Sequence, residues 1–354
     1  MAMEATPSEI VDVLSHREDL VRCLLNRPKS KQELVEELDI SRSTVDRATR
    51  ELESLDLTEC SENGYELTLY GRLTTESYSE FQERIAGVYR TWHPIESPPP
   101  IARTVAILKQ RFELMECLLV DPLDKRDLVD ELDVSRSTID RGIRDLECLR
   151  LIERSAEGLV STQCGRELLC EYEGLESELE DLLAARKLLV ILDADAHIDS
   201  IILEDAEAIL ANDAVPHYPG TRMLDMLREA TRSKGMSPTY THTGVRDLFH
   251  NRIAPGKMEA EQIFRTEMFE RIRSLYPDLS QILVENSNFE LFTIDDLPFG
   301  LFLLERDNGA CVCVLIYDPD NNLRGVIINE STEALAWGEQ TYQRYKRRAK
   351  PAEL

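Results

Sequence analysis

Serine and arginine side chains recur in this chain at the spacing of a single helix face. Ser43, Arg47 and Arg50 stand at positions i, i+4 and i+7 of one segment, which places them on one stripe of an α-helix. Arginine carries a planar fork of donors that fits the two acceptors of guanine, and serine suits a phosphate or a base edge. The same stripe returns 94 residues later as Ser137, Arg141 and Arg144. These residue types at this spacing predict two surfaces that contact duplex DNA.

An alternative use of these arginines is pairing with acidic neighbours on a solvated helix face, since Asp46 and Glu51 lie close to them in the sequence. Two independent copies of the stripe favour DNA contact over this alternative. The complete set of residues predicted to contact DNA comprises Ser41, Arg42, Ser43, Thr44, Arg47, Arg50 and Asn63 in the first copy and Ser135, Arg136, Ser137, Thr138, Arg141 and Arg144 in the second.

The two stripes belong to a longer internal repeat. Residues 17–72 align without a gap on residues 111–166, and roughly half of the aligned positions are identical. The densest match is LDISRSTVDR (38–47) against LDVSRSTIDR (132–141). The period is too long and the copies are too few for a solenoid. Two copies of a compact DNA-binding unit explain the repeat better.

The elements that position the first stripe can be predicted from the apolar pattern. A helix ends at Arg27-Pro28, a short helix begins after the cap Ser30, and a third begins after the cap Ser41. The third helix carries an apolar face of Val45, Ala48, Leu52 and Leu55. Residues 57–69 then alternate around Asn63-Gly64, which predicts a two-residue hairpin. Three helices and a hairpin form a winged helix-turn-helix unit, whose third helix enters the major groove. The second copy repeats every element, with Glu157-Gly158 at its hairpin tip.

With these residues, each copy resembles the archaeal winged helix-turn-helix regulators, of which SRSTVDR and SRSTIDR are typical. The whole chain is similar to haloarchaeal regulators that follow such units with an effector domain of the methanogenesis-regulator middle-domain type. This second resemblance depends on Pro216-His217-x-Pro219, on VRDLFHN (245–251), on DLPFGLF (296–302) and on the amphipathic C-terminal helix. That family usually carries one winged helix, so the duplication departs from its pattern.

The charge of the chain opposes a simple DNA-binding interpretation. The formal net charge is −26, with 9 lysines against 32 arginines and acidic residues in every segment. DNA-binding faces are normally basic. An acidic excess with scarce lysine indicates a cytoplasm at molar salt, where the Debye length falls to about 3 Å and long-range repulsion from phosphates nearly vanishes. Under those conditions binding depends on local contacts and burial, because counter-ion release is weakened. We therefore expect a halophilic protein.

Other bulk features restrict the function class. No run of 18 apolar residues and no signal or lipidation motif occurs, so we expect a cytoplasmic protein without membrane contact. The eight cysteines have no CxxC spacing, which argues against a zinc ribbon or a redox motif. Cys311 and Cys313 share one face of the apolar run ACVCVLIYD. We interpret them as core residues, with a metal or thiol-sensor role as the alternative, and we predict no cofactor.

Composition shifts divide the chain into five parts. These are a first winged-helix domain (1–92), a Pro-rich linker (93–103), a second winged-helix domain (104–168), a connecting helix (169–194) and an effector domain (195–354). The connecting helix carries an incomplete leucine seam, which could join two protomers or pack on the C-terminal domain of its own chain. We predict a homodimer, because this helix directly joins the DNA-binding part to the effector part.

The remainder of the chain has the pattern of mixed α and β structure. Strands are expected at 203–210, 236–241, 289–294, 299–305, 311–317 and 323–328, and helices at 220–232, 244–252, 265–275 and 331–347. Short turns between the last four strands predict an antiparallel meander. The fold class is therefore helical with two tandem winged helices in the first half, and α+β with an antiparallel sheet in the second.

Polar residues that could bind an effector gather around two predicted helices of this second half. A helix N-terminus beside an arginine suits an anion, and a histidine at a pocket mouth can donate or bind metal. Ordinary surface packing is the alternative for each residue alone. The candidate ligand-binding residues are His217, Tyr218, Arg222, Tyr240, His242, His250 and Arg252.

An enzyme is the main rival from another class. The C-terminal pattern loosely resembles phospholipase-D-like domains, whose catalytic forms need HxK, but no histidine here is followed two positions later by lysine. GxSxG, P-loop, HExxH and dinucleotide motifs are also missing. A winged-helix assembly adaptor or a chromatin-type architectural protein is the other alternative. We predict a sequence-specific transcriptional regulator that binds double-stranded DNA and responds to a small molecule.

Overall fold

The computed structural model describes residues 5–94, 99–212, 214–239 and 247–353. Contacts within the chain divide it into two compact units. The N-terminal unit comprises residues 1–67 and 71–183, and the C-terminal unit comprises residues 68–70 and 184–354. Among the described residues, no helix is both long and apolar enough to cross a membrane. The finer five-part division expected from the sequence stays a prediction.

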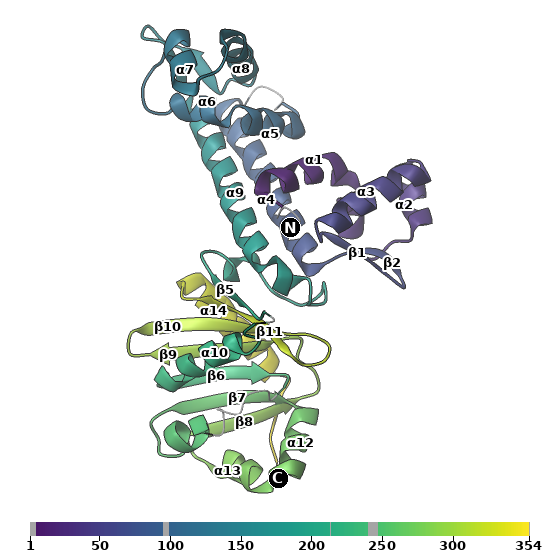
Figure 1. Ribbon diagram of the computed structural model, residues 1–354, viewed down its shortest axis with the longest axis vertical. Helices are drawn as coiled ribbons and strands as arrows, with labels where there is room; N and C mark the ends of the chain where they lie inside the picture. Colours follow the sequence, from purple (N-terminus) through teal and green to yellow (C-terminus); the bar gives the residue numbers. More distant parts are fainter. Residues whose placement is uncertain (1–4, 95–98, 213, 240–246, 354) are drawn as a thin grey trace. The chain divides into compact units, whose positions relative to one another are not determined.

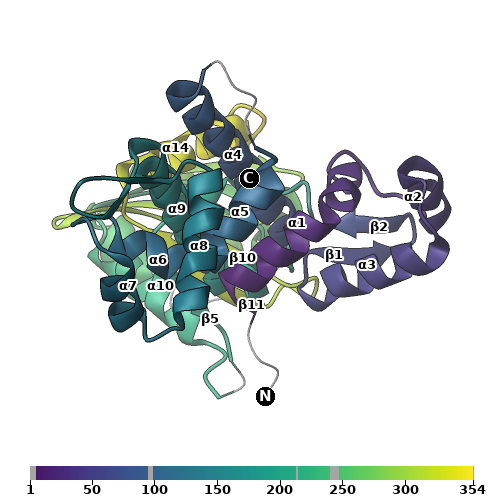
Figure 2. The same ribbon diagram turned by 90° about the horizontal axis from the view of Figure 1, so that it is seen from above.

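The N-terminal unit begins with the first repeat, which we define as elements α1 to α4 (Figure 1). Three helices lead into a two-stranded hairpin and a long helix, and Figure 2 shows the hairpin beside the third helix. The elements are α1 (Pro7–Leu24), α2 (Lys31–Leu38), α3 (Arg42–Ser54), β1 (Thr58–Ser61), β2 (Gly64–Leu67) and α4 (Leu69–Trp92).

The second repeat, elements α5 to α9, has the same order. Here α5 and α6 correspond to the two halves of α1, because both repeats break their first helix at an arginine. Arg17 has φ −118° and ψ 16°, and Arg111 has φ −118° and ψ 18°. The elements are α5 (Ile101–Gln110), α6 (Phe112–Cys117), α7 (Lys125–Leu132), α8 (Arg136–Cys148), β3 (Ile152–Arg154), β4 (Leu159–Ser161) and α9 (Gln163–Leu189).

Local chemistry explains where the short helices begin. Ser30 and Glu33 form a reciprocal capping box at the start of α2, which satisfies two backbone donors. Asp124 and Asp127 form the equivalent box at the start of α7. Both α2 and α7 end on an aspartate in the left-handed conformation, Asp39 and Asp133, each with φ 51°.

The first hairpin differs from its predicted turn by one residue. We expected Asn63-Gly64 to be the two turn residues, but Ser61 pairs with Gly64, so Glu62 and Asn63 form the turn. Gly64 has φ +115°, and a Cβ atom there would lie 2.4 Å from the carbonyl oxygen of Lys29. The glycine is therefore required both by its positive φ and by the close approach of the chain before α2.

The leucine side chains predicted to form a seam on the connecting helix are buried by contacts within this chain. Leu168, Leu175 and Leu179 of α9 are buried within a single chain, and the Tyr172 ring packs on Phe81 of α4 with a centroid distance of 6.2 Å. The seam packs on the long helix of the other repeat, which is neither of the two partners expected from the sequence. It therefore gives no support to a homodimer.

The C-terminal unit contains an eight-stranded mixed sheet with the order β12-β8-β7-β6-β9-β10-β11-β5. The pairs β6–β7 and β7–β8 are parallel, and the other pairs are antiparallel. The strands are β5 (Glu207–Leu210), β6 (Arg232–Ser237), β7 (Glu259–Arg265), β8 (Phe289–Ile294), β9 (Gly300–Arg306), β10 (Gly309–Tyr317), β11 (Leu323–Asn329) and β12 (Lys350–Pro351).

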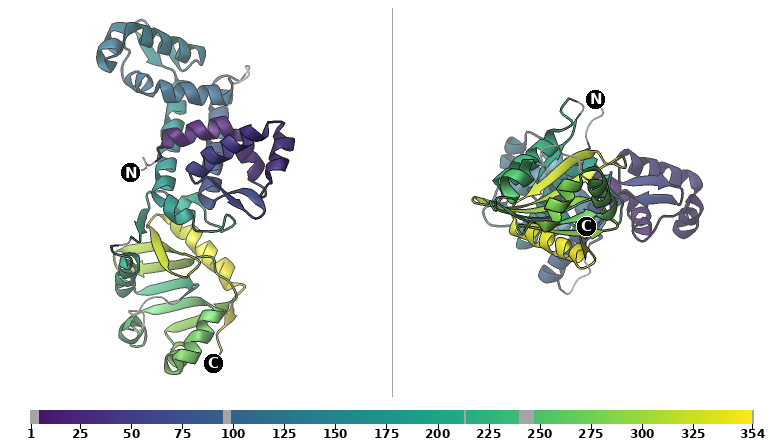
Figure 3. Two further views of the ribbon diagram at one scale, coloured as in Figure 1. Left: turned by 45° about the vertical axis from the view of Figure 1, so that its right-hand side comes forward. Right: turned by 90° about the horizontal axis from the view of Figure 1, so that it is seen from below.

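Helices cover both faces of this sheet (Figure 3). One face packs against α10 (Tyr218–Glu229), the π-helical turn η2 (Phe249–Ile253), α12 (Thr266–Leu275) and α13 (Pro277–Glu285) in a single apolar cluster. Cys311 and Cys313 lie in this cluster, fully buried, with their sulfurs 3.9 Å apart. The other face packs against α14 (Thr332–Lys346), where Gly338 closely approaches Val312. A 3-10 turn, η1 (Ser200–Ile202), precedes β5.

The mixed helix and sheet composition, rich in antiparallel pairs, agrees with the predicted fold class. Several element predictions for this half were wrong. Residues 203–206 are not a strand, β6 begins at Arg232 inside the expected helix, and β7 was missed. The strands at 289–294 and 299–305 are not neighbours in a meander, because β7 and β6 lie between them. The helix expected at 244–252 lies partly outside the described residues.

Candidate nucleic-acid interface

The N-terminus of α3 is held by a cluster of hydroxyl groups. Ser41 caps the helix by accepting a hydrogen bond from the backbone amide of Thr44 at 3.2 Å. Its hydroxyl also lies 2.8 Å from the hydroxyls of Ser43 and Thr44. Ser135, Ser137 and Thr138 repeat this arrangement on α8. The first serine of each set is thus a structural cap, while the following residues of the first turn present arginine and serine to solvent.

The acidic side chains of α3 are paired with residues of other helices. Asp46 forms an ion pair with Lys31 of α2, and Glu51 forms one with Arg17 of α1 at 2.7 Å. Arg47 lies between these two acids in the sequence and is exposed. Its guanidinium forms no hydrogen bond or ion pair with any residue in the part of the chain that the structure describes. The stripe of α3 is therefore available to an external anion.

The acidic side chains of α8, in the second repeat, are likewise paired with cations that lie outside this helix. Asp140 pairs with Lys125 of α7, and Asp145 accepts from Arg111 at 2.8 Å. The hydrogen bond from Lys125 lowers the pKa of Asp140, and this outweighs the opposing effect of desolvation. Asp140 is thus charged at neutral pH, and its charge is compensated from outside α8. Arg144 turns back along the helix and donates from Nε to the Asp140 carbonyl oxygen at 3.1 Å.

The residues predicted to contact DNA on α3 and α8 differ in exposure from the apolar residues of the same helices. Arg42, Ser43, Arg47 and Arg50 are all exposed on α3, while Val45, Ala48, Thr49 and Leu52 form its buried face. On α8 the exposed residues are Arg136, Ser137, Arg141 and Arg144, and the buried ones are Ile139, Gly142, Ile143 and Leu146. In each helix the arginine stripe thus faces solvent, opposite the core.

The two hairpin tips carry different chemistry. Asn63 is exposed, and its backbone amide donates to the Ser61 hydroxyl at 3.3 Å. The equivalent position in the second repeat is Glu157, held by Ser155 in the same way at 3.2 Å. An amide can donate to a phosphate, whereas a carboxylate is repelled by one. The repeats are alike in their helices but not at these tips.

Two family models match separate parts of the chain, and the first of them matches each of the two repeats. Residues 9–89 and 102–183 match the family described as the HVO_A0261 N-terminal domain. Residues 216–348 match the middle domain of the methanogenesis regulatory protein FilR1. The predicted resemblance of the C-terminal half to the methanogenesis-regulator middle domain is thereby confirmed.

No curated protein matches the chain closely enough to count as a relative. Among solved structures, the chain is similar to TrmBL2, described as an archaeal chromatin protein with a novel mode of DNA binding. The identity is 13%, the TM-score is 0.34, and the match covers 71% of this chain and 99% of TrmBL2.

The described residues among those predicted to bind an effector do not line two cavities of the C-terminal unit, one apolar and one polar. His217, Tyr218 and His250 are exposed. Arg222 lies 3.9 Å from Glu207, and Arg252 donates to the Ala230 carbonyl oxygen at 2.7 Å. None of these five lines either cavity. The other two candidates, Tyr240 and His242, lie outside the described residues.

The small apolar cavity lies between the sheet and its helical cover. Its volume is about 90 Å³, and its walls come from β6, β7, β8 and β9 on one side and from η2, α12 and α13 on the other. Gln262, 94% buried, is its main polar side chain, and the Nε2 atom donates to the Ser233 hydroxyl at 3.2 Å. A ligand in the cavity could form a hydrogen bond with the side-chain amide of Gln262.

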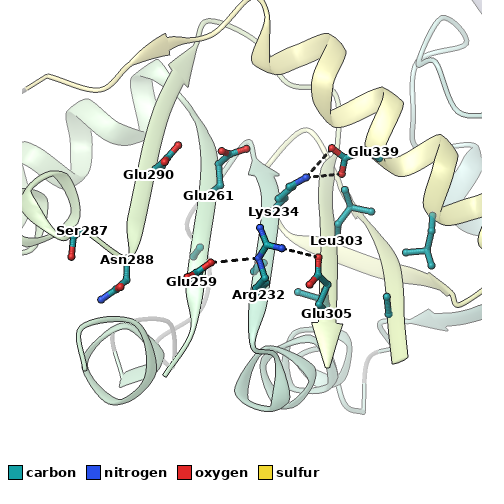
Figure 4. Close-up of a pocket in the computed structure, with 15 residues that line it drawn as sticks. Arg232, Lys234, Glu259, Glu261, Ser287, Asn288, Glu290, Leu303, Glu305 and Glu339 are labelled. Carbon is teal, nitrogen blue, oxygen red and sulfur yellow. Dashed lines mark hydrogen bonds and ion pairs between the residues drawn. The ribbon is translucent and has the colours of Figure 1, made fainter. Parts of the chain in front are cut away.

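The second hollow, of about 420 Å³, lies on the opposite, polar side of β6 and β7 (Figure 4). Its cations are already paired with carboxylates. Lys234 donates to both oxygens of Glu339 at 2.8 and 3.0 Å, and Arg232 lies 3.5 Å from Glu259 and 3.6 Å from Glu305. These ion pairs leave no uncompensated positive charge at those two residues for an anion. We interpret this surface as a solvated charge network.

Proposed function

We propose that the chain is a sequence-specific, double-stranded DNA-binding transcription regulator, and that each repeat is a winged helix-turn-helix unit. The observation that carries the proposal is the pairing of the acids on α3 and α8 with cations of other helices. An arginine stripe whose acidic neighbours are compensated elsewhere can bind an anion without first breaking an ion pair. The occurrence of this arrangement in both repeats supports a shared function.

The proposed contacts follow from position on the helix. Arg42 and Ser43, in the first turn of α3, are placed for phosphates, and Arg47 and Arg50 for base edges in the major groove. Asn63 at the hairpin tip would donate to a phosphate. In the second repeat Arg136, Ser137, Arg141 and Arg144 take the equivalent roles, with Ser135 and Thr138 supporting the helix start as Ser41 and Thr44 do in the first.

The net charge of −26 requires a particular solvent for this function. We propose that the protein works at molar salt, where a screening length of about 3 Å removes the repulsion between distant carboxylates and phosphates. Ion pairs such as Lys31–Asp46 and Lys125–Asp140 act within that length. Binding then depends on the exposed stripes themselves and little on the overall charge.

The decisive experiment measures binding to a selected operator at molar KCl. Arg47→Ala and Arg141→Ala should each weaken specific binding by about 1–3 kcal/mol. Arg22→Ala is a matched control, because Arg22 is an exposed arginine of the same unit that pairs with Glu18 on α1. Equal affinity for all duplex sequences would instead favour an architectural chromatin role, and no affinity for any duplex would favour an assembly adaptor.

We also propose that the C-terminal unit binds a small-molecule effector. The apolar cavity, with the buried side chain of Gln262 in its wall, supports this second function. It favours a small, uncharged, mostly apolar molecule that carries one hydrogen-bonding group. The sequence-predicted set around His217 and Arg222 favours an anion at another place. If the effector regulates DNA binding, it must change the affinity of the protein for DNA, and DNA must change the affinity of the protein for the effector by the same factor.

A further inference from the structure

The two repeats contact each other through equivalent helices. Residues 7–16 of α1 and residues 101–110 of α5 correspond at the repeat distance of 94 residues, and the two helices lie against each other. Lys109 of α5 forms an ion pair with Asp12 of α1 and donates to the Ser8 carbonyl oxygen at 2.9 Å. The first helix of one repeat thus packs on the first helix of the other.

The long helices α4 and α9, which end the two repeats, also contact each other. Arg84 of α4 donates to Glu171 at 2.7 Å and to Glu178 at 3.1 Å, and Glu178 is the residue that occupies the position of Arg84 in the second repeat. Further along α4, Trp92 donates to Glu167 at 2.8 Å. A later residue of α4 contacts an earlier residue of α9, so the two helices run antiparallel.

These contacts distinguish two kinds of internal symmetry. In a head-to-tail repeat, one surface of the first copy meets a different surface of the second, as in solenoids. In a two-fold arrangement, each copy uses the same surface, and a residue near the axis meets its own equivalent. Position 84 meets its own equivalent, and the paired helices are antiparallel. Both observations match the two-fold arrangement.

We propose that a single chain is an internal dimer that reads an inverted repeat in duplex DNA. This inference rests on the proposed function, because it assigns α3 and α8 to DNA. A two-fold relation turns the second recognition helix by half a turn relative to the first, so it meets a half-site of opposite direction. The partner is therefore a pseudo-palindromic duplex, bound by one chain.

The two halves of this operator should not be identical. Asn63 at one hairpin tip corresponds to Glu157 at the other, so an amide that is proposed to contact a phosphate in one half is replaced by a carboxylate in the other half. Two identical protomers would impose two identical half-sites, whereas two diverged repeats impose two related ones. The expected site is an imperfect inverted repeat with one half bound more tightly.

The test uses the full chain and selection from random duplexes at molar KCl. The enriched sequences should contain an imperfect inverted repeat, and sedimentation of the complex should give one chain per duplex. Inserting about 5 base pairs between the half-sites, half a helical turn, should lower the affinity at least about tenfold. Arg47→Ala should remove the requirement for one half-site, and Arg141→Ala the requirement for the other.

A variant at the axis tests the internal dimer separately. Arg84→Ala removes the contact with Glu171 and Glu178 but lies outside α3 and α8, so it should keep both half-site sequences and reduce the penalty for altered spacing. Glu83→Ala, at an exposed neighbouring position of α4, is its control. A direct repeat, a single half-site or two chains per duplex would overturn the inference while leaving DNA binding intact. Failure to enrich any duplex would instead overturn the proposed function.

Discussion

The guanidinium of Arg17 lies 2.7 Å from the carboxylate of Glu51, so the break in α1 is tied to the proposed recognition helix α3. Arg111 and Asp145 make the equivalent contact at 2.8 Å. In each repeat the arginine is the non-helical residue of its segment, and its partner stands four positions after the central arginine of the stripe, Arg47 or Arg141. The ion pair keeps a carboxylate away from a side chain that is proposed to bind DNA.

The first prediction follows from this pair. Arg17→Ala should free Glu51 to bind Arg47 at i, i+4, and DNA affinity should fall severalfold although Arg17 itself does not face DNA in this proposal. Adding Glu51→Ala should restore most of the affinity. The measurement is a double-mutant cycle of DNA affinity and of unfolding free energy. Additive losses of affinity would show that Glu51 does not compete for Arg47.

The second prediction concerns two glycines at equivalent positions. A Cβ at Gly71 would lie 1.8 Å from the Leu57 carbonyl oxygen, and one at Gly165 would lie 2.1 Å from that of Leu151. Either Gly→Ala substitution should therefore destabilise the protein by about 2 kcal/mol or more. A Cβ added at Gly174 of α9 would meet nothing within 4 Å, so Gly174→Ala should be neutral or stabilise by up to about 1 kcal/mol. Thermal melts of the three variants test this prediction, and equal melting temperatures for all three would contradict it.

The third prediction concerns salt. Transfer from molar KCl to about 0.1 M lengthens the screening length to about 10 Å. The net charge of −26 then repels itself over longer distances, and the melting temperature should fall by several degrees or more. A melting temperature that stays constant or rises on dilution would mean that the acidity serves another purpose.

The fourth prediction concerns acid. The backbone amide of Ser30, together with Arg27 and the Ser30 hydroxyl, lowers the pKa of Glu33 from 4.5 to about 2. Because the folded pKa is depressed, the stabilisation is complete above about pH 4.5 and is lost as the pH falls towards 2. Glu33→Gln should remove this part of the pH dependence. As the pH falls from 4.5 to 2, the wild type loses the stabilisation and the variant does not, so the difference in unfolding free energy between them should shrink. An unchanged difference across that range would contradict the prediction.

The fifth prediction concerns the apolar cavity, with phenol and toluene as probes of similar shape. Phenol carries a hydroxyl that can hydrogen-bond to the side-chain amide of Gln262, so it should raise the melting temperature more than toluene does. Gln262→Leu should reverse that preference. Gln281→Leu, at an exposed position of α13, should leave it unchanged. If the two probes act equally on the wild type, the side-chain amide does not bind a ligand in this cavity.

Local signals made the N-terminal unit predictable. The caps Ser30, Ser41 and Ser135 each stand directly before their helices, and the apolar faces of α3 and α8 follow the helical period. The partners of the acids could not be predicted in this way. Asp46 pairs with Lys31 and Glu51 with Arg17, which lie in other helices, and a pattern within one helix carries no information about such distant contacts.

The sheet of the C-terminal unit was harder to predict for a geometric reason. Strands β6 and β7 place Lys234 and Glu261 on the polar hollow, so their apolar alternation is weak. The short segment between Ile294 and Gly300 suggested adjacent strands. Three strand spacings amount to about 14 Å, while six residues can span about 20 Å. A short connection therefore fits strands that have two others between them.

The capping boxes of α2 and α7 have a consequence for how this chain can change over time. Ser30 with Glu33 and Asp124 with Asp127 achieve the same cap with different residues. In an assembly of two identical subunits, any substitution appears twice and its cost in free energy is doubled. Here each half mutates alone, so a substitution is tested once, against a neighbour that is unaltered. Duplication within one chain therefore lets one half vary while the other preserves the ancestral chemistry.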